Sequence, residues 1–407
     1  AVSGMHVALV FLVLSKILGF IKGFRFSLIL KVTVILIAIW MYCIISGLSP
    51  SVIRAGFMIS FILIGKAINR YANAYNIMGI TAFLILWYNP FWLLNVGFQL
   101  SFAAVLGILV FNEKLLKLYN PENYLLNACW QIISVTLSAQ IFTFPLSLYY
   151  FNQFPIYFLP ANLIIIPLTT LIIYLSLVLL FVNSIPVLNV VFGWLTSKIV
   201  VLTNKLVMLF ESLPGAIVDG IYINLIQLIL IFCALSAFVV FVHYKFKPAF
   251  FLSLVLVVPV IIISDFNTIS SRGVARFVKF DIPKAHVFLF TNGQESILFK
   301  DTFTLEQLSY HVKGWMVHHN AWPPKQVVNI KTLGIHPFQS PSNGWMYRNG
   351  IIAWNKFRVT LIPEVYDKYK YAKFFFFFKN IQYTEKKNEK DKKPCYIVWF
   401  GDKSKIL

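Results

Sequence analysis

The chain has 407 residues, of which 59% are hydrophobic and only 12% are charged, and its mean hydropathy is +0.76. Soluble domains carry about 25% charged residues, so this composition excludes a single soluble globule, a disordered chain and a disulfide-rich scaffold. It predicts a polytopic membrane protein. The 35 basic residues outnumber the 15 acidic ones, giving a net charge of +20. This surplus predicts anionic partners, namely phospholipid head groups, nucleic acid or both.

Ten apolar stretches fill the chain up to residue 264, most of them close to the roughly 20 residues that a helix needs to cross a bilayer. They cover residues 2–20, 28–48, 50–68, 76–94, 97–111, 126–148, 156–182, 186–212, 223–244 and 248–264. The fourth and fifth are short and share the break Asn89-Pro90, which predicts that one or both form a half-helix or a re-entrant segment. Residues 1–264 are therefore expected to form an all-α polytopic membrane domain of about ten spans or re-entrant segments.

Positive charge is distributed unevenly between these stretches. The even-numbered loops, near residues 46–49, 95, 151–154 and 219, carry no lysine or arginine. The loops after the first, third, fifth and ninth stretches carry Lys22, Arg25, Lys66, Arg70, Lys114, Lys117, Lys245 and Lys247. The positive-inside rule then places the odd loops in the cytoplasm and the region after the tenth stretch outside it. One span more or fewer would invert this last conclusion.

Residues 265–407 have the composition of a soluble domain and hold 22 of the 35 basic and 11 of the 15 acidic residues. Short alternating apolar runs predict strands, and Asn292-Gly293 predicts a hairpin turn. The predicted strands cover 276–282, 286–290 and 296–300, followed by a helix-like stretch at 304–312 and two more strand-like runs near 345–363. We expect a small β-rich soluble C-terminal domain over residues 265–407.

The end of the chain has an unusual composition. Five consecutive phenylalanines at residues 374–378 precede the lysine-rich run 386–393. Two interpretations stay open, a buried strand followed by a solvated tail, or a reading-frame slip or truncation that altered the sequence after Lys373. Resequencing the coding DNA of this stretch separates them.

Polar residues interrupt the apolar stretches at a few positions, where they are costly in a bilayer. His6 stands near the start of the first stretch and either caps the helix at the interface or contacts a ligand such as phosphate. Arg54 lies about one turn after the helix-start pair Ser49-Pro50. Its guanidinium either snorkels to the interface or lines a cavity and grips phosphate with paired donors. The small residues that follow Arg54 favour the second reading.

Two further polar positions lie in the middle of the domain. Gln99 and Ser101 belong to the stretch 97–109, which is rich in small residues that suit tight helix packing. Gln99 therefore either joins two helices or contacts a ligand. Asn162 lies between Pro160 and Pro167, and because proline lacks a backbone donor, a kink or break is expected there.

Residues 194–212 have the periodicity of an amphipathic helix, with Lys198 and Lys205 on its polar face. Such a helix either lies on the membrane surface or lines a pore and contacts a nucleic-acid strand. No HxHxDH, HExxH, GxxxxGK[ST] or GxSxG motif occurs, and there is no CxxC pair. The sequence therefore predicts no enzyme, no metal site and no cofactor.

Four of these segments, in this order, resemble the competence domain of the ComEC family, the inner-membrane proteins of natural transformation. They are SG-x-H at residues 3–6, SPS-x-x-RA-x-x-M at 49–58, the GFQLSF segment at 97–109 and NL-x-x-x-P at 162–167. The resemblance spans roughly residues 1–245. It implies a multi-pass protein of the plasma (inner) membrane that passes one DNA strand into the cytoplasm while the other is degraded outside. As candidate DNA-path or DNA-binding residues we take Arg54, Lys198, Lys205, Gln99, Ser101, His6 and Asn162.

The resemblance also implies partners. These are single-stranded DNA, membrane lipids, other DNA-uptake proteins such as an extracytoplasmic DNA receptor and a cytoplasmic helicase, and, as one option, a second copy of the chain. The OB-like domain that the family carries before SG-x-H and the metallo-β-lactamase-like nuclease domain are not recognisable, so a fragment without nuclease activity is expected. The alternative functions are a polytopic transporter of a small solute or lipid and, less favoured, a membrane-anchored extracytoplasmic hydrolase.

Overall fold

A computed structural model of the chain describes two compact units, Ala1–Ser264 and Asp265–Leu407. The described residues are 4–18, 25–70, 73–182, 184–271, 275–282, 285–292, 295–300, 305–329, 338–339, 345–348, 351–354, 357–360 and 398–400. The phenylalanine run at 374–378 and the lysine-rich run after it lie outside these residues. The chain is a polytopic helical membrane protein with a small region of β-sheets at its C-terminal end.

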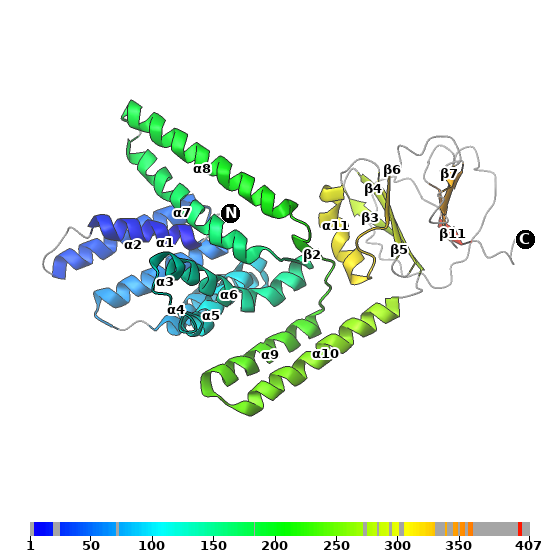
Figure 1. Cartoon of the computed structure of the whole chain (residues 1–407), viewed down its shortest axis with the longest axis horizontal. Coiled ribbons are helices and arrows are strands. Elements are labelled where there is room, and N and C mark those ends of the chain that lie inside the picture. The colour runs from blue at the N-terminus through cyan, green and yellow to red at the C-terminus, as the bar shows by residue number, and fades with distance from the viewer. Residues whose placement is uncertain are drawn as a thin grey trace, which may run out of the picture. The chain divides into compact units, whose positions relative to one another are not determined.

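The first unit is built from ten α-helices in the described residues (Figure 1). They are α1 (Gly4–Ile17), α2 (Arg25–Ile45), α3 (Pro50–Ala67), α4 (Ala74–Tyr88), α5 (Val96–Leu116), α6 (Tyr124–Phe151), α7 (Phe158–Val182), α8 (Pro186–Ser212), α9 (Leu225–Tyr244) and α10 (Lys247–Ser271). Eight of these are long and apolar enough to cross a membrane, whereas α1 and α4 are shorter. The ten predicted stretches therefore correspond to ten helices.

Asparagine marks the start of several of these helices, because its side chain accepts the free N–H groups of a first helical turn. The asparagines that cap α4, α5, α6 and α9 are Asn73, Asn95, Asn123 and Asn224. At Asn224 the cap is reciprocal, since the Gln227 side chain accepts from the Asn224 backbone. Proline at the first position starts α3 at Pro50, as the sequence predicts.

The structure adds three details to the sequence prediction. The fifth stretch is a full-length helix of 21 residues, because α5 continues past residue 111 to Leu116. The break at Asn89-Pro90 is a short 3-10 helix, η2 (Pro90–Leu94), between α4 and α5. The sequence predicts a kink or break near Asn162, and the structure has no break there, since α7 is one continuous helix through Pro167. Pro160 stands in the first turn of α7, where no backbone donor is needed.

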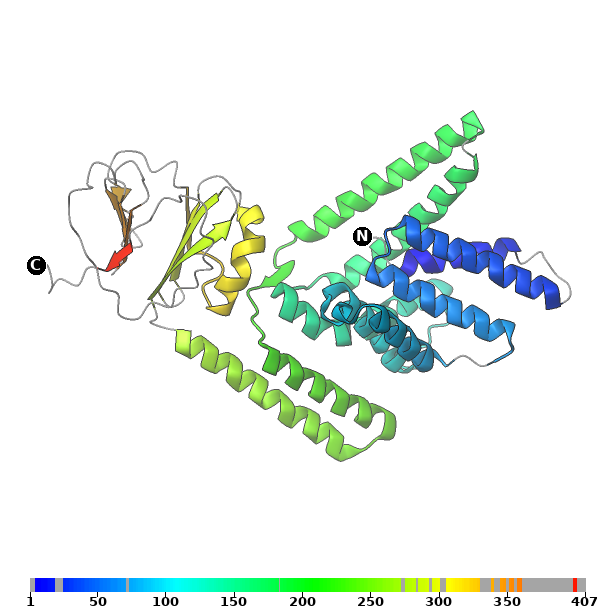
Figure 2. The same cartoon turned by 180° about the vertical axis from the view of Figure 1, so that it is seen from behind.

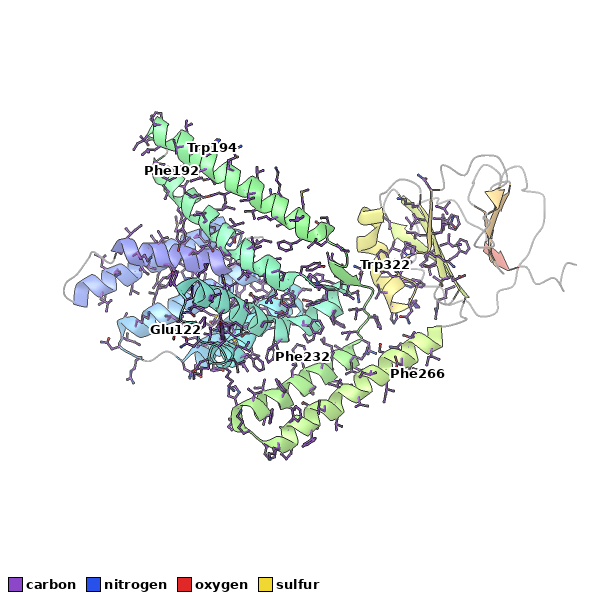
Figure 3. The ribbon with its side chains drawn as sticks, viewed as in Figure 1. Glu122, Phe192, Trp194, Phe232, Phe266 and Trp322 are labelled. Carbon is purple, nitrogen blue, oxygen red and sulfur yellow. The ribbon has the colours of Figure 1, made fainter. Side chains whose placement is uncertain are left out.

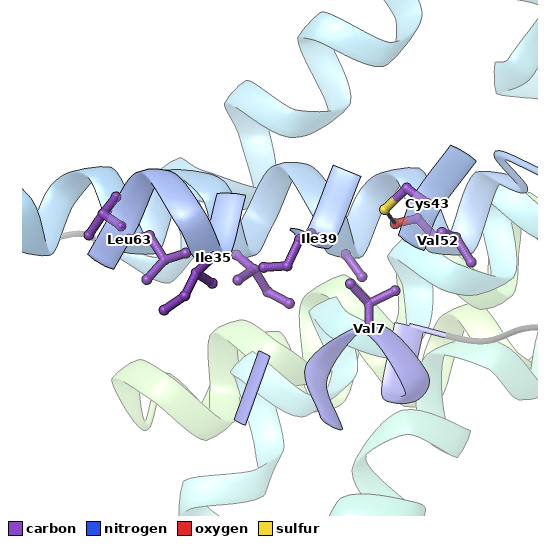
Figure 4. Close-up of a cluster of buried hydrophobic side chains, with 9 residues drawn as sticks. Val7, Ile35, Ile39, Cys43, Val52 and Leu63 are labelled. Carbon is purple, nitrogen blue, oxygen red and sulfur yellow. Dashed lines mark hydrogen bonds between the residues drawn. The ribbon is translucent and has the colours of Figure 1, made fainter. Parts of the chain in front are cut away.

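A cluster of buried apolar side chains joins α1, α2 and α3 (Figure 4). Val7, Ile39 and Val52 are completely buried in it. Gly56 of α3 allows close packing here, because a Cβ at this position would lie 3.0 Å from the Cys43 sulfur on α2. Small residues at such contacts are how helices associate in a bilayer, where the hydrophobic effect between spans is absent.

The helices α5 and α6 pack even more closely. A Cβ on Gly107 would overlap the backbone oxygen of Ser138, so the two backbones meet without an intervening side chain. Nearby, the Ser134 hydroxyl donates to the Asn112 side chain at 2.8 Å. Figures 1 and 2 show α7 and α8 running side by side as one hairpin and α9 and α10 as another, the latter joined where Gln227 donates to the Val260 carbonyl.

The loops at the helix ends agree with the predicted alternation of sides. The loop after α6 pairs with the loop after α8 through strands β1 (Gln153–Pro155) and β2 (Ile217–Asp219), so both even loops lie at one end of the unit. The C-terminal halves of α5 and α9 share one apolar cluster, which places two odd loops together at the other end. Positive charge gathers at that second end, as a cytoplasmic surface requires.

A reporter fused after residue 247 is therefore expected to be cytoplasmic, and one fused near residue 275 extracytoplasmic, because α10 crosses the membrane between them. Paired alkaline-phosphatase and fluorescent-protein fusions at the two positions measure this directly. Both fusions reporting the same side would show that α10 does not span.

The second unit contains two sheets. The strands β3 (Ala275–Ile282), β4 (Ala285–Asn292) and β5 (Glu295–Lys300) form an antiparallel meander, and α11 (Leu305–His318) leads to β6 (Gln326–Asn329), which is parallel to β5. One face of this sheet packs on α11 through Val287, Leu289 and Met316. The second sheet has the order β11-β10-β9-β8-β7.

The strands of the second sheet are β7 (Phe338–Gln339), β8 (Trp345–Arg348), β9 (Ile351–Trp354), β10 (Phe357–Thr360) and β11 (Val398–Phe400). The sequence predicts two strands near 345–363, and the described residues there form three, β8, β9 and β10, which pair antiparallel in that order.

Candidate functional site

Arg54 is the permanently charged side chain placed inside a span, and three helices meet around it. Its Nε donates to the Ser101 hydroxyl on α5 at 2.6 Å, and its Nη1 lies 3.7 Å from the Met58 sulfur. The guanidinium carbon lies 6.0 Å from the centre of the Phe102 ring. Among the described residues no carboxylate pairs with it. Arg54 therefore stands beside neutral groups, with its positive charge uncompensated.

The first helix, α1, approaches the Arg54 guanidinium closely at Gly4. A Cβ at Gly4 would lie 3.1 Å from Nη2 of Arg54 and 3.3 Å from the Cβ of Ala55. Any larger residue at this position would push α1 away from α3. The glycine of the SG-x-H segment thus lets α1 close one side of the Arg54 site, and the side chain itself is half-buried.

The three helices α1, α3 and α5 contribute residues from their N-terminal turns to the Arg54 site. Gly4 is the first residue of α1, Arg54 lies in the second turn of α3, and Ser101 lies in the second turn of α5. The N-terminal end of a helix carries a partial positive charge and free N–H groups. The partial charge at these three helix ends has the same sign as the charge of Arg54.

Gln99 has a structural task in this arrangement. Its amide nitrogen donates to the Leu93 carbonyl at 2.8 Å, and its oxygen accepts from the Tyr150 hydroxyl on α6 at 2.8 Å. Gln99 thereby fastens η2 and the end of α6 to α5. Gln99 lies on α5 two residues before Ser101, the hydrogen-bond partner of Arg54.

His6 and Asn162 lie near the same ends of their helices. His6 is half-buried on α1, two residues after Gly4, and Asn162 is half-buried in the first two turns of α7. No described contact joins either side chain to Arg54. Their part in a DNA path stays a prediction.

Lys198 and Lys205 are not brought together with Arg54. Both are exposed on α8. This helix packs against α7, and Thr203 is its buried side chain. The ammonium of Lys198 lies 5.7 Å from the ring centre of Trp194, one turn earlier (Figure 3). The amphipathic pattern thus identifies an exposed polar face, and the structure separates that face from the Arg54 site.

The histidines of the second unit have ordinary packing roles where they are described. The His319 ring stacks on Trp315 with centroids 3.9 Å apart, and its Nδ1 lies 2.8 Å from the Trp315 carbonyl oxygen. Burial lowers the pKa of His319, which favours the neutral ring. Within the described ranges, no three His, Cys, Asp or Glu side chains are grouped so that they could hold a metal ion.

Sequence reasoning missed the residues that complete the Arg54 site. Phe102 and Met58 belong to the GFQLSF and SPS-x-x-RA-x-x-M segments, but their residue types are common inside spans and do not by themselves indicate contact with Arg54. Gly4 was visible as part of the SG-x-H segment, but its closeness to Arg54 depends on how α1 packs against α3.

Comparisons with known proteins place the chain in a family. A family model described as "Competence protein" matches residues 1–248. The protein "ComE operon protein 3" from Bacillus subtilis (strain 168) is 28% identical over 166 residues, which is 40% of this chain and 20% of that protein. The chain thus aligns with about a fifth of the length of this curated relative. No solved structure matches the chain. Because the family model covers more than half of its residues, the chain belongs to the Competence protein family.

Proposed function

We propose that this chain takes part in DNA uptake during natural transformation and forms a path for a single DNA strand across the plasma (inner) membrane. The observation that carries the proposal is the Arg54 site, where a charged guanidinium without a carboxylate partner meets the N-terminal ends of three helices. Membership of the Competence protein family supports the biological setting. In this proposal the chain transports DNA and does not cut it.

The chemistry of a DNA strand fits this site. A strand that crosses a bilayer carries one negative charge on each phosphate, and each charge needs a favourable environment in place of water. Arginine holds phosphate with paired donors. Aromatic rings lie beside Arg54, since Phe102 is next to the guanidinium and Phe98 packs against Phe102 with centroids 4.4 Å apart, and stacking on aromatic side chains tolerates any base. Such a path accepts every sequence, as DNA uptake without sequence preference requires.

The position of the site agrees with the direction of transport. Arg54 and Ser101 lie near the end of the unit that carries the even loops, which the charge distribution places outside the cytoplasm. The lysine-rich odd loops lie at the opposite end. A strand would therefore meet Arg54 first and leave between the lysines, with an extracytoplasmic receptor supplying it and a cytoplasmic helicase drawing it in.

A deletion strain tests this proposal. Cells without the chain are expected to bind labelled DNA at their surface but to accumulate no label in the cytoplasm, and the intact gene should restore uptake. Normal uptake in the deletion strain would overturn the proposal. Unchanged DNA uptake combined with loss of a small solute or lipid would favour the transporter alternative.

Lys198 and Lys205 are expected to contribute in a graded way. Replacing both with alanine should lower uptake about two- to tenfold, because exposed lysines make salt-sensitive, sequence-independent phosphate contacts. Measuring uptake at two salt concentrations tests both the electrostatic cause and the magnitude of the loss. The difference between the variant and the wild-type chain should be smaller at high salt. A loss that does not change with salt would indicate a packing role for α8 instead.

A further inference from the structure

The opposite end of the first unit holds a second group of positive and donor side chains, apart from the Arg54 site. Nζ of Lys114, in the last turn of α5, is buried and has no hydrogen-bond partner among the described residues. The same holds for Nε1 of Trp130, in the second turn of α6. An unpaired buried ammonium is costly, so such a group needs an acceptor.

The packing brings these donors to one level of the membrane. Gly107 faces Ser138, and Asn112 bonds to Ser134, so the antiparallel register of α5 and α6 places Lys114 beside the turn that contains Trp130. Lys245 ends α9 at the same level, because Val242 of α9 and Leu115 of α5 pack against one apolar cluster.

The acidic residues nearby do not neutralise this pair. Glu113 is engaged by Lys117 at 2.6 Å, and both side chains are exposed. Glu122, labelled in Figure 3, is an exposed residue of the loop before α6, and no described contact joins it to Lys114. Within the described residues, no ion pair joins Lys114 or Lys245 to a carboxylate, although Glu113 is the neighbour of Lys114 in the chain.

The surroundings of this group are apolar and outward-facing. Large side chains more than half exposed surround the lysines at the ends of α5, α6 and α9, namely Leu118, Tyr119, Tyr124, Leu125, Tyr244 and Phe246. The Tyr119 ring stands edge-on to Trp130 with centroids 5.7 Å apart. Lysines framed by tyrosine, tryptophan and leucine match the boundary between lipid head groups and acyl chains.

We propose that Lys114, Lys245 and Trp130 bind the phosphate of an anionic phospholipid of the cytoplasmic leaflet. The two ammonium groups neutralise the phosphate, the indole N–H donates to one of its oxygens, and the exposed apolar side chains contact the acyl chains. The cytoplasmic leaflet is rich in anionic lipid, and basic sites at helix ends on that side suit its head groups. The site does not depend on the proposed path for DNA.

The test compares lipids on the purified full chain in detergent. Phosphatidylglycerol is expected to raise the melting temperature more than phosphatidylcholine and to remain bound in native mass spectra. Lys114→Gln combined with Lys245→Gln should lower phosphatidylglycerol retention about tenfold, and Trp130→Phe should lower it less. Lys117→Gln is the matched control at the same end, and it should leave retention unchanged because Lys117 is already paired with Glu113.

Several results of these measurements would contradict the lipid-binding proposal. Equal stabilisation by both lipids, or equal retention in all variants, would overturn it. An identical effect of inorganic phosphate would show a site for free anion, and displacement of the lipid by a short single-stranded oligonucleotide would assign the lysines to DNA. The double variant without lipid should melt no lower than the wild-type chain, because it removes charges that lack a partner. A lower melting temperature there would indicate that the lysines are structural.

Discussion

Arg54→Ala is expected to lower the uptake of labelled DNA into the cytoplasm about 10- to 100-fold while the protein remains inserted at its normal level. A loss of this magnitude corresponds to the free energy of a hydrogen bond to a charged group, which is about 1.5–3 kcal/mol. The guanidinium holds Ser101 at 2.6 Å and lies against Gly4, yet it pairs with no carboxylate in the described residues. Its removal takes away the hydrogen bond to Ser101 and, in this proposal, the phosphate partner of the strand.

Two further variants separate the possible roles of this side chain. Arg54→Lys should restore only a small part of uptake, because lysine supplies charge without the planar fork. Ser101→Ala should have a milder effect of about fivefold, since it removes only the hydrogen bond that orients the guanidinium. If Arg54 simply reached the membrane interface, Arg54→Lys would be silent, and full uptake by Arg54→Ala would remove Arg54 from the path.

The second large effect concerns the contact between α5 and α6. Gly107→Ala is expected to destabilise the folded protein by about 1–3 kcal/mol, because the new methyl group would overlap the Ser138 carbonyl and force the helices apart. Size-exclusion chromatography and thermal melting in detergent measure the loss. Since α5 also carries Ser101, uptake should fall in parallel with the amount of folded protein.

Gly79 provides the matched control for this variant. It also lies inside a helix, α4, but no atom lies within 4 Å of the Cβ it would carry. Gly79→Ala should be neutral or slightly stabilising, since alanine is a better helix former by roughly 1 kcal/mol. Equal behaviour of the two variants would show that the close approach at Gly107 does not hold the unit together.

The helical layout could be predicted from the sequence because apolar length alone nearly decides where a helix can span. The loop charges predicted the alternation of sides in the same way, and the pairing of β1 with β2 agrees with it. The C-terminal end of α5 and the continuity of α7 could not be predicted from apolar length in the same way. Polar residues near a helix end, such as Asn112 and Lys114, continue a helix when a neighbour packs against it.

Only part of the candidate site could be predicted from the sequence. Arg54 stood out because a charge in a span is rare, whereas its partners became visible only from the packing of α1, α3 and α5. Ser101 lies 47 positions away, and no periodicity connects it to Arg54. Lys198 and Lys205 are exposed on one helix, as are Leu202 and Leu209 of the predicted apolar face, and periodicity assigns a face to a helix without saying what that face contacts.

The most direct test of the central claim asks whether the entering strand touches the Arg54 site. A photoreactive phenylalanine analogue at Phe102, whose ring lies beside the guanidinium, would be activated by light during the uptake of labelled DNA. Phe83, which is 59% exposed on α4, is the control position. We expect labelled DNA to become covalently attached to the chain at position 102 and not at position 83. Normal accumulation of label in the cytoplasm with no attachment at position 102, or with equal attachment at both, would show that the strand does not pass Arg54.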